Sequence, residues 1–453
     1  MRVIIAGAGK VGFSAAEILS AEGHDVCVID SDPATVNILS NNLDVICVEG
    51  SATSSGVLKE AGAAEADLVF AATRSDETNM VCGITARRLG TKHVIARVRD
   101  EGYLSETEFL RDALGLSVIV NPEYECAMEI SRILRFPSAI RVDAFSAGKL
   151  EIAEHRIAED SVLAGVQLKD LGQRFNSKVL VGVVQRDGEA IIPKGDFTLA
   201  KGDLLNITGT PRELRKFFVS AKAYQRPIKN VMIMGGGRLG VYLARMLLES
   251  GMTVSVVEND AARCDELCEL IPAARVIHGD ATRSEVLLEE GLRTTDAFVA
   301  LTGDDGDNII TSMYAKRCCG GKIVLKVNRE YYGDILSGAG LDSVVTPRTL
   351  ISQQLARYVR AMSNSEGSSM ETLYRIAGGK VEALEFKVGP ESACAGIPLK
   401  ELKMKKNVLI CSVVRGGKSF IPDGDTVIRP GDHAVVVTEA GWLKDLDAII
   451  EVG

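Results

Sequence analysis

The hydrophobic pattern at the start of the chain predicts a strand, a tight turn, a helix and a second strand. An apolar run at residues 3–6 leads directly to Gly7, Gly9 and Gly12, and after a helical pattern a second apolar run ends on Asp30. A strand followed by this glycine spacing, a helix, another strand and an acid is the dinucleotide-binding fingerprint in its proper context. We therefore expect a nucleotide site at the first turn.

Each residue of the fingerprint has a physical role. Gly7 permits the sharp turn, Gly9 lets the backbone approach a pyrophosphate, and Gly12 lets the helix pack closely on the strand. The start of the helix offers unpaired N–H groups to phosphate oxygens. The carboxylate of Asp30 can accept hydrogen bonds from ribose hydroxyls and would repel a 2′-phosphate. The site is therefore predicted to bind NAD rather than NADP.

The alternation of strand and helix patterns continues beyond Asp30. The predicted helices lie at residues 33–41, 57–61 and 79–89, and the predicted strands lie at residues 45–48, 68–72 and 93–98. Strands and helices that alternate at these lengths form a doubly wound parallel sheet with right-handed crossovers. The ligand edge of such a sheet is formed by the carboxyl ends of its strands.

This whole pattern is written a second time in the chain. At a nearly constant offset, residues 7, 9, 12 and 30 correspond to Gly235, Gly237, Gly240 and Glu258, and residues 49–53 correspond to residues 278–282. Further along, Thr73, Asp76, Asn79 and Arg97 correspond to Thr302, Asp305, Asn308 and Lys326. The repeat thus covers the glycine turn and all the strand ends that would surround a nucleotide.

Each copy closes with a helical stretch that begins at proline, at Pro122–Arg135 and at residues 347–362. Proline is suited to the first position of a helix. Apolar residues gather on one side of the first stretch, including Ala127, Ile130 and Leu134. We expect these helices to leave their sheet domains and to pack against the other copy.

Beyond each of these helices the pattern changes to short β segments separated by turn residues. In the first copy they lie at residues 150–154, 165–171, 179–185, 191–196 and 201–207, and in the second at residues 381–386, 396–402, 408–414, 420–425 and 430–435. Gly-Asp pairs before alternating apolar residues are typical of hairpin turns. Each copy is therefore expected to carry a small β-rich α+β domain.

A chain of 453 residues is too long for one core, and three or four domains are expected. We predict a first Rossmann-like domain at residues 1–135, its small domain at 136–222, a second Rossmann-like domain at 227–362 and its small domain at 368–453. Residues 221–227 and the Ser/Asn/Gly-rich residues 363–369 are the predicted linkers.

The candidate nucleotide-binding residues are the glycine turns, the acids and the polar residues at the other strand ends. In the first copy they are Gly7, Gly9, Lys10, Val11, Gly12, Asp30, Ser51, Ala52, Thr73 and Arg97, and in the second they are Gly235, Gly237, Arg238, Leu239, Gly240, Glu258, Asp280, Ala281, Thr302 and Lys326. Ser51 or Asp280 is expected on the adenine side, and the two threonines near the pyrophosphate or nicotinamide half. Arg97 and Lys326 are expected to neutralise phosphate, with ordinary solvated charges as the alternative.

Composition removes several other classes of protein. The net charge of −9 gives no signature of nucleic-acid binding. No uncharged apolar run reaches the roughly 18 residues needed to span a bilayer, and a first strand that begins at Arg2 leaves no room for a signal peptide. The ten cysteines form no CxxC pair and have no histidine at metal-ligand spacing. We expect reduced thiols in a cytosolic protein.

Catalytic groups are missing opposite both fingerprints. A dehydrogenase needs a general acid or base that faces the nicotinamide, and the histidines are only His24, His93, His155, His278 and His433. His278 corresponds to Glu49 in the first copy, and small domains of about 80 residues are too slight to enclose a substrate. We therefore predict that the chain is not an enzyme and that the nucleotide is a signal. An NAD-dependent oxidoreductase, and a scaffold with fingerprints kept only for packing, remain the alternatives.

The tandem arrangement resembles the TrkA family, the regulatory subunits of prokaryotic Trk-type potassium uptake systems, over essentially the whole chain. The resemblance rests on residues 7–12, Asp30, residues 50–53 and 279–282, the strand end at residues 71–73, and the GxxLxDL-like residues 165–171 and 396–402. It implies tandem RCK-type (KTN-type) units that bind NAD, NADH or an adenine nucleotide such as ATP or ADP. Ser51 in place of Asp280 leaves open whether both sites prefer the same nucleotide.

The resemblance also implies partners and a location. It implies a dimer or tetramer ring of such units that gates an integral-membrane potassium-translocating subunit, from the cytoplasmic face of the cell membrane. We expect the mechanism to be conformational, because nucleotides that differ in charge or in the nicotinamide half would favour different angles between the two Rossmann-like domains. The two proline-started helices are the expected hinges and dimer contacts.

Overall fold

The computed structural model describes residues 1–104, 106–136, 139–145, 148–222, 228–329, 332, 336, 339–341, 343–364, 370–377, 380–439, 443 and 445–451. Of the two predicted linkers, residues 223–227 and 365–369 lie outside the described residues. Within the part of the chain that is described, no helix combines the length and apolar character that a membrane crossing requires.

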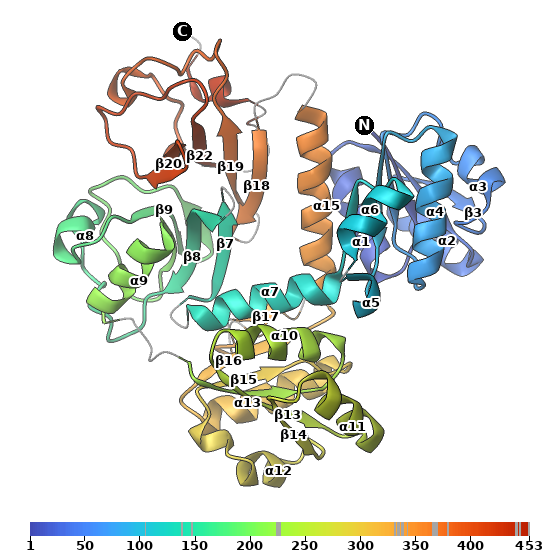
Figure 1. The fold of residues 1–453 in the computed structure, drawn as a ribbon. Coiled ribbons are helices and arrows are strands. Elements are labelled where there is room, and N and C mark those ends of the chain that lie inside the picture. The colour runs from blue at the N-terminus through green and yellow to red at the C-terminus, as the bar shows by residue number, and fades with distance from the viewer. Residues whose placement is uncertain are drawn as a thin grey trace. The chain divides into compact units, whose positions relative to one another are not determined.

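The first α/β domain is a six-stranded parallel sheet flanked by helices (Figure 1). Its strands run in the order β3-β2-β1-β4-β5-β6, and every pair of neighbours is parallel. Its elements are β1 (Arg2–Ala6), α1 (Lys10–Ala21), β2 (Asp25–Asp30), α2 (Pro33–Asn42), β3 (Ile46–Glu49), α3 (Ser55–Glu60), β4 (Leu68–Ala71), α4 (Asp76–Leu89), β5 (His93–Arg97), α5 (Glu101–Leu104), α6 (Thr107–Leu114), β6 (Val118–Val120) and α7 (Pro122–Arg135).

Local sequence explains why these elements begin and end where they do. Residues 3–6 of β1 and 68–71 of β4 are fully buried, since helices cover both faces of a parallel sheet, so these strands are unbroken apolar runs. Helix α4 begins where the Ser75 Oγ accepts a hydrogen bond from the Thr78 N–H at 3.1 Å. It ends at Gly90, whose φ of 119° few other residues tolerate.

The second α/β domain repeats this topology, with the strand order β14-β13-β12-β15-β16-β17. Its elements are β12 (Asn230–Met234), α10 (Arg238–Glu249), β13 (Thr253–Glu258), α11 (Ala261–Leu270), β14 (Arg275–His278), α12 (Ser284–Glu289), the 3₁₀ helix η2 (Leu292–Thr294), β15 (Ala297–Ala300), α13 (Asp305–Cys318), β16 (Lys322–Lys326), β17 (Val344–Val345) and α15 (Pro347–Asn364). The duplication seen in the sequence is therefore a duplication of structure.

The two small domains are five-stranded antiparallel sheets of the same order, β7-β8-β11-β9-β10 and β18-β19-β22-β20-β21. The first consists of β7 (Arg141–Phe145), β8 (Leu150–Arg156), α8 (Leu168–Arg174), β9 (Leu180–Arg186), β10 (Glu189–Ile191), β11 (Leu204–Gly209) and α9 (Pro211–Ser220). The second consists of β18 (Met370–Ile376), β19 (Val381–Lys387), η4 (Leu399–Glu401), β20 (Val408–Arg415), β21 (Lys418–Phe420), β22 (His433–Glu439) and η5 (Leu446–Ile449).

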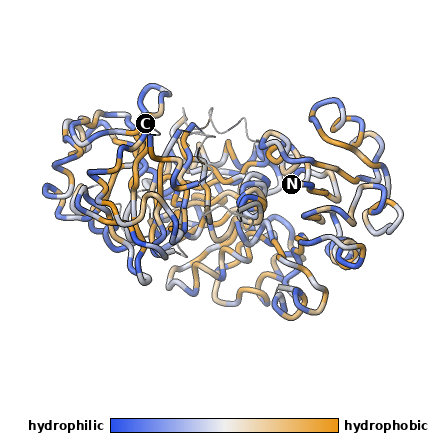
Figure 2. Tube along the Cα trace, turned by 90° about the horizontal axis from the view of Figure 1, so that it is seen from above, coloured by the Kyte–Doolittle hydropathy of each residue, from blue (hydrophilic) through white to orange (hydrophobic). Residues whose placement is uncertain are grey.

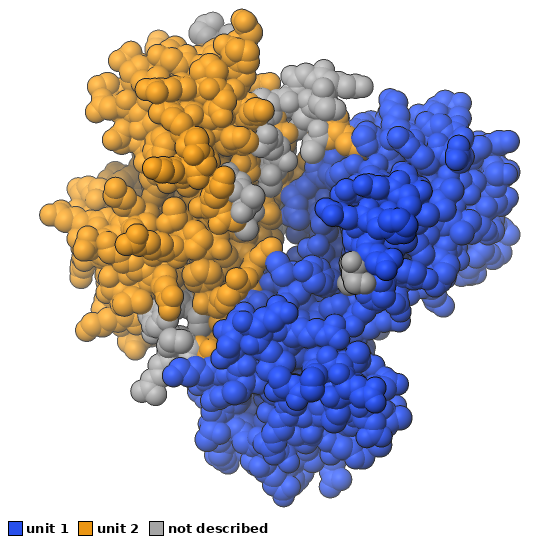
Figure 3. All heavy atoms as spheres, in the orientation of Figure 1, with its two compact units in different colours: residues 1–131, 229–359 blue, residues 132–228, 360–453 orange. Residues whose placement is uncertain are grey.

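The chain divides into two compact units (Figure 3). One unit contains residues 1–131 and 229–359, which are the two α/β domains, and the other contains residues 132–228 and 360–453, which are the two small domains. Helices α7 and α15 each begin in the first unit and end in the second. The boundaries of the four domains drawn from the sequence stay predictions.

The predicted fold class is confirmed, and several segments differ from the prediction. The β segments expected at residues 165–171 and 396–402 are wrong, because residues 168–171 belong to α8 and residues 399–401 to η4. Those expected at residues 191–196 and 420–425 are also wrong, because β10 ends at Ile191 and β21 at Phe420. Strands β6 and β17, which complete the parallel sheets, were not predicted, because two or three residues carry too little pattern. Strands β7 and β18, which start the antiparallel sheets, were also missed.

A shared apolar core joins the two small sheets face to face. It includes Phe145, Ile152 and Val183 from the first sheet and Val381, Cys411 and Val437 from the second. A Cβ built on Gly182 would stand 3.0 Å from the Cys411 Sγ, which shows how closely the sheets approach. Figure 2 shows the hydrophobic stretches along the strands. Burial of both inner faces holds this unit together.

Val183 provides a test of this core. Its side chain is fully buried, so Val183→Ala should lower the free energy of unfolding by about 2 kcal/mol through the lost methyl groups and the cavity they leave. Val162→Ala makes the same change at a position that is 36% exposed and should shift stability by less than about 0.5 kcal/mol. Urea unfolding of both variants measures the difference, and equal effects would contradict the assignment of Val183 to the core.

Candidate functional site

The two glycine turns lie at the carboxyl ends of β1 and β12 and have nearly the same geometry. Gly7 and Gly235 have φ values of 103° and 105°, which side chains rarely tolerate. A Cβ on Gly12 would stand 1.9 Å from the Gly7 carbonyl oxygen, and one on Gly240 would stand 2.4 Å from that of Gly235. Helices α1 and α10 therefore start directly against the turn, with their free N–H groups at the edge of the sheet.

The middle glycines differ from the others because they border open space. A Cβ built on Gly9 or on Gly237 meets no atom within 4 Å. This is the space that a pyrophosphate would need beside the helix N-terminus. The turns thus fit the phosphates of a dinucleotide in both copies.

The acids that end the second strands hold the glycine turns. The Asp30 Oδ2 accepts a hydrogen bond from the Ala8 N–H at 2.6 Å, and its Oδ1 accepts one from the Asp32 N–H at 2.9 Å. Glu258 makes the same connections with its longer side chain, since its Oε2 accepts from the Gly236 N–H at 2.7 Å and its Oε1 accepts from the Asp260 N–H at 3.1 Å. The Oε1 also accepts from the Asn259 N–H at 2.8 Å. Each carboxylate fixes the turn beside which a ribose would lie.

The ends of the third strands differ between the copies. Ser51 and Asp280 are both exposed, and the small residues that follow them, Ala52 and Ala281, are each 7% exposed. The Ser51 and Thr53 hydroxyls are 2.9 Å apart, whereas the Asp280 Oδ1 accepts from both the N–H and the Oγ1 of Thr282. The Thr282 hydroxyl, followed by its N–H, lowers the pKa of Asp280, so this carboxylate is charged.

A buried asparagine braces the end of the fourth strand in each copy. The Asn79 Oδ1 accepts from the N–H and Oγ1 of Thr73 at 2.8 and 2.7 Å, and its Nδ2 donates to the Arg97 carbonyl oxygen at 2.8 Å. Asn308 makes the same contacts to Thr302 and Lys326. Both asparagines are fully buried. They position the two threonines. The sequence repeat paired the two asparagines but did not indicate this role.

Arg97 and Lys326 are half-buried at this edge. The Arg97 Nη2 donates to the Thr73 carbonyl oxygen at 2.9 Å, and the Lys326 Nζ donates to the Leu301 carbonyl oxygen at 3.3 Å. Burial lowers the pKa of both groups. The phosphate role proposed for them stays a prediction. Lys10 and Arg238, at the first positions of α1 and α10, are exposed, whereas Val11 and Leu239 pack beneath them and are 7% exposed.

In the second copy these parts enclose a cavity of about 540 Å³. It is lined by residues 234, 235 and 237 of the turn, 257–259, 279–282, 301–304 and 307. The ends of β12, β13, β14 and β15 therefore meet at one pocket, whereas Lys326, at the end of β16, is not among its lining residues. Among the described residues, no group of three or more His, Cys, Asp or Glu side chains is arranged to hold a metal ion.

The distinct roles of the glycines can be tested by stability. Gly12→Ala should lower the free energy of unfolding by about 2 kcal/mol or more, because its Cβ would overlap the Gly7 carbonyl. Gly9→Ala is the matched control and should leave stability nearly unchanged, since its Cβ meets open space. Thermal unfolding of the two variants makes the comparison, and a Gly12→Ala protein as stable as the wild type would show that the close approach is misplaced.

Comparison with known families gives two matches, each repeated along the chain. The TrkA-N domain model matches residues 3–122 and 231–347, and the TrkA-C domain model matches residues 152–220 and 383–450. The TrkA-N matches contain both glycine turns and both acids. The TrkA-C matches contain most of the two antiparallel sheets.

Curated relatives match over the full length of the chain. A Trk system potassium uptake protein TrkA homolog of Archaeoglobus fulgidus is 31% identical over 99% of this chain and 100% of its own. The Trk system potassium uptake protein TrkA of Halomonas elongata is 31% identical over 100% of this chain and 99% of its own. The protein of that name from Vibrio alginolyticus is 29% identical over the same shares. These relatives are named as proteins of potassium transport and not as enzymes. This agrees with the prediction that the chain is not an enzyme.

Solved structures support the fold. The GsuK channel bound to NAD superimposes with a TM-score of 0.63 at 21% identity, covering 97% of this chain and 77% of the other. The GsuK RCK domain gives a TM-score of 0.62 at 20% identity and covers 97% and 92%. Together with both domain models and the full-length relatives, this places the chain in the TrkA family, as a tandem of two TrkA-N and TrkA-C pairs.

Proposed function

We propose that the chain is a nucleotide-binding regulatory subunit of a Trk-type potassium uptake system. The observation that carries the proposal is the presence of two nucleotide-site edges of matching geometry within one compact unit. Both edges keep the turn, the acid and the asparagine brace. The potassium-transport names of the relatives support the assignment of the system.

The ligand that this geometry favours is NAD or NADH, with ATP or ADP as further candidates. Open space beside Gly9 and Gly237 suits a pyrophosphate, and the carboxylates of Asp30 and Glu258 suit ribose hydroxyls. The same carboxylates disfavour a 2′-phosphate. A bound nucleotide would bring its charge and volume into the site, and the residues around it would adjust their positions.

The response would pass through the contact between the two α/β domains. Tyr242, on the helix that begins at the second glycine turn, donates its hydroxyl hydrogen to the Arg99 carbonyl oxygen at 3.1 Å and accepts from the Asn121 Nδ2 at 3.3 Å. Burial raises the pKa of Tyr242 to about 12, so the hydroxyl stays a donor at neutral pH. The Arg245 Nη1 and the Glu101 Oε2 form an ion pair at 2.9 Å nearby.

This contact leads directly to the first site. The Arg99 N–H donates to the Asp76 Oδ2 at 2.8 Å, and Asp76 is the first residue of α4, immediately after the Thr73 segment. A nucleotide that moves the start of α10 would therefore shift the strand ends of the first site. Such a ligand changes the angle between the domains only by its difference in affinity for the two arrangements.

The partner in this proposal is an integral-membrane potassium-translocating subunit. The chain would act on it from the cytoplasmic side of the membrane, as a dimer or tetramer ring with other copies of itself. Purification of the chain together with membranes that do or do not contain the transport subunit tests this partner. Equal retention on both membranes would refute it.

The main rival is an NAD-dependent oxidoreductase. It requires a protein group that moves a proton or orients a substrate beside the nicotinamide. The His278 Nε2 lies 3.2 Å from the Asn259 carbonyl oxygen, and the first copy has Glu49 at that position. Substrate-dependent oxidation of NADH by the purified protein would favour the rival.

Calorimetric titration with NADH tests the sites. Gly9→Asp and Gly237→Asp should each remove one binding event, because each carboxylate would enter the space of the pyrophosphate without meeting other protein atoms. Asp30→Ala should weaken binding at the first site by about tenfold through the lost charge-assisted hydrogen bonds. Unchanged binding by the double glycine variant would leave only the scaffold interpretation.

Tyr242→Phe tests the connection between the sites. Loss of the hydroxyl removes both hydrogen bonds to the first domain, so the effect of one bound nucleotide on the affinity of the other site should fall toward none. Affinities at each site alone should stay within about threefold. Tyr124→Phe is the control, since that ring packs edge-on against Tyr242 and can do so without its hydroxyl. Full coupling in Tyr242→Phe would exclude this route.

A further inference from the structure

The two nucleotide sites share their backbone geometry and differ in charge. The second cavity is lined by four carboxylates, Glu258, Asp280, Asp304 and Asp307, and its lining contains no lysine or arginine. In the first copy the corresponding residues are Asp30, Ser51, Ser75 and Thr78. Three carboxylates of the second site are thus hydroxyl residues in the first.

The three extra carboxylates lie at the mouth of the cavity. Asp280, Asp304 and Asp307 are exposed, and the Asp304 Oδ1 accepts from the Asp307 N–H at 2.9 Å. Because these groups come from the ends of the third and fourth strands, they face the same volume from two directions. Their charges add to that of Glu258 wherever a ligand lies between them.

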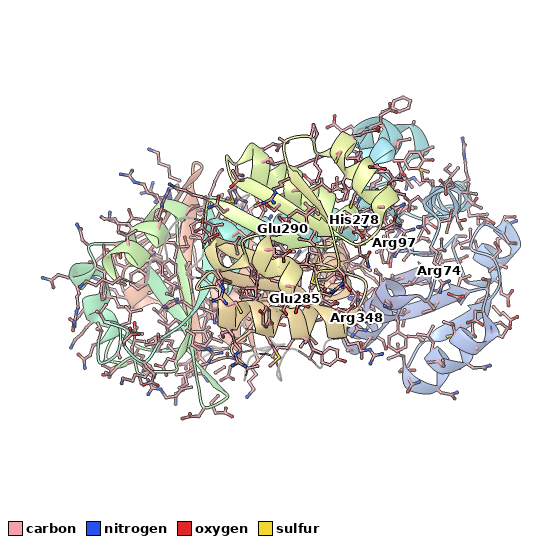
Figure 4. The ribbon with its side chains drawn as sticks, turned by 90° about the horizontal axis from the view of Figure 1, so that it is seen from below. Arg74, Arg97, His278, Glu285, Glu290 and Arg348 are labelled. Atoms are coloured by element: carbon pink, nitrogen blue, oxygen red, sulfur yellow. The ribbon has the colours of Figure 1, made fainter. Side chains whose placement is uncertain are left out.

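In the first copy one carboxylate and one cation stand where the second copy has glycines. The carboxylate is Glu77, in place of Gly306, and its Oε2 accepts from the Ser75 hydroxyl at 2.7 Å. Arg74 stands where the second copy has Gly303, and it is exposed on the segment after β4 (Figure 4). After hydrogen bonds from Thr35 and Ala34, its charge helps to lower the pKa of Asp32, which places it near the N-terminus of α2. Arg74 therefore lies near the residues that follow β2, at the ligand edge of the first sheet.

Two cations lie beside the second turn, Arg238 at the first position of α10 and Arg263 on α11, and Lys10 in the first copy matches the first of them. Arg263 corresponds to Thr35, and its Nε donates to the Gly236 carbonyl oxygen at 2.9 Å. Its Nη1 pairs with the Glu266 carboxylate at 2.6 Å, so most of its charge is already matched. Arg283, where the first copy has Ser54, also lies near Asp280 and helps to lower the pKa of that carboxyl group, so the excess of negative charge at the second site is reduced by one cation and not removed.

We propose that the second site selects against polyphosphate charge and binds NAD in preference to metal-free ATP, whereas the first site accepts ATP. The proposal rests on the proposed function, because it assigns different ligands to the two nucleotide sites. NAD carries two phosphates and a cationic nicotinamide ring, whereas ATP carries three phosphates, so four carboxylates repel ATP more strongly. Asp280, Asp304 and Asp307 are the residues that set this preference.

Single-site proteins allow the comparison. Gly9→Asp leaves the second site and Gly237→Asp leaves the first, and each is titrated with NAD and with ATP in EDTA and about 50 mM KCl. The ratio of NAD affinity to ATP affinity should be at least about tenfold higher at the second site, which corresponds to about 1.4 kcal/mol. Equal ratios at the two sites would overturn the inference. Absence of nucleotide binding by both proteins would overturn the proposed function and this inference with it.

A swap of residues identifies the determinants. In the Gly9→Asp protein, Asp280→Ser, Asp304→Ser and Asp307→Thr together should raise the affinity for ATP about tenfold and change that for NAD by less than about threefold. The control removes three exposed charges outside the cavity lining, through Glu249→Gln, Asp265→Asn and Glu269→Gln, and should leave the ratio unchanged. An equal gain in both triple variants would show that net charge, and not the pocket, sets the preference.

Salt supplies a test that needs no further substitution. In the Gly9→Asp protein the excess of NAD affinity over ATP affinity should shrink as KCl rises to about 300 mM, because exposed charges are screened. A ratio that does not change with salt would contradict an electrostatic origin.

Discussion

The contact between the start of a helix and a glycine carbonyl is the constraint on which both nucleotide sites depend. A Cβ on Gly12 would overlap the Gly7 carbonyl oxygen at 1.9 Å, and one on Gly240 would overlap that of Gly235 at 2.4 Å. This approach fixes the first N–H groups of α1 and α10 at the sheet edge, where Asp30 and Glu258 hold the turn from the other side. The third and fourth strand ends follow from this placement, because the parallel sheet sets their distance from the turn.

Buried parts of the site agree between the two copies, and exposed parts do not. Asn79 and Asn308 make the same set of hydrogen bonds from fully buried positions, where a change would leave backbone groups without partners. Ser51 and Asp280 are exposed, as are Arg74 and Gly303, and substitutions there cost the fold little. One scaffold can therefore carry two sites of different charge.

Much of this structure could be predicted from the sequence, because its signals are periodic and repeated. The apolar runs of β1 and β4 are buried on both faces, and the glycine spacing with Asp30 occurs in strand and helix context twice. The sequence did not predict four short elements, namely β6, β17, α8 and η4. In segments this short, tertiary contacts and not the local sequence pattern decide the conformation. The partial burial of Arg97 and Lys326 at the edge could not be predicted either, because the sequence of a strand end does not show how far its last side chain is covered.

The joint between the α/β domains explains why duplication matters for a sensor. A single domain of this kind binds a nucleotide but has no second body whose angle could report the binding. Here Tyr242 belongs to the helix whose N-terminus borders one site, and its partner Arg99 holds Asp76 at the edge of the other. Tyr242 and Arg99 are not part of the glycine pattern, because their contact forms only where the two α/β domains meet. Under the proposed function a nucleotide at either site would act on the same joint, and reciprocity would then require that each site influence the other to the same degree.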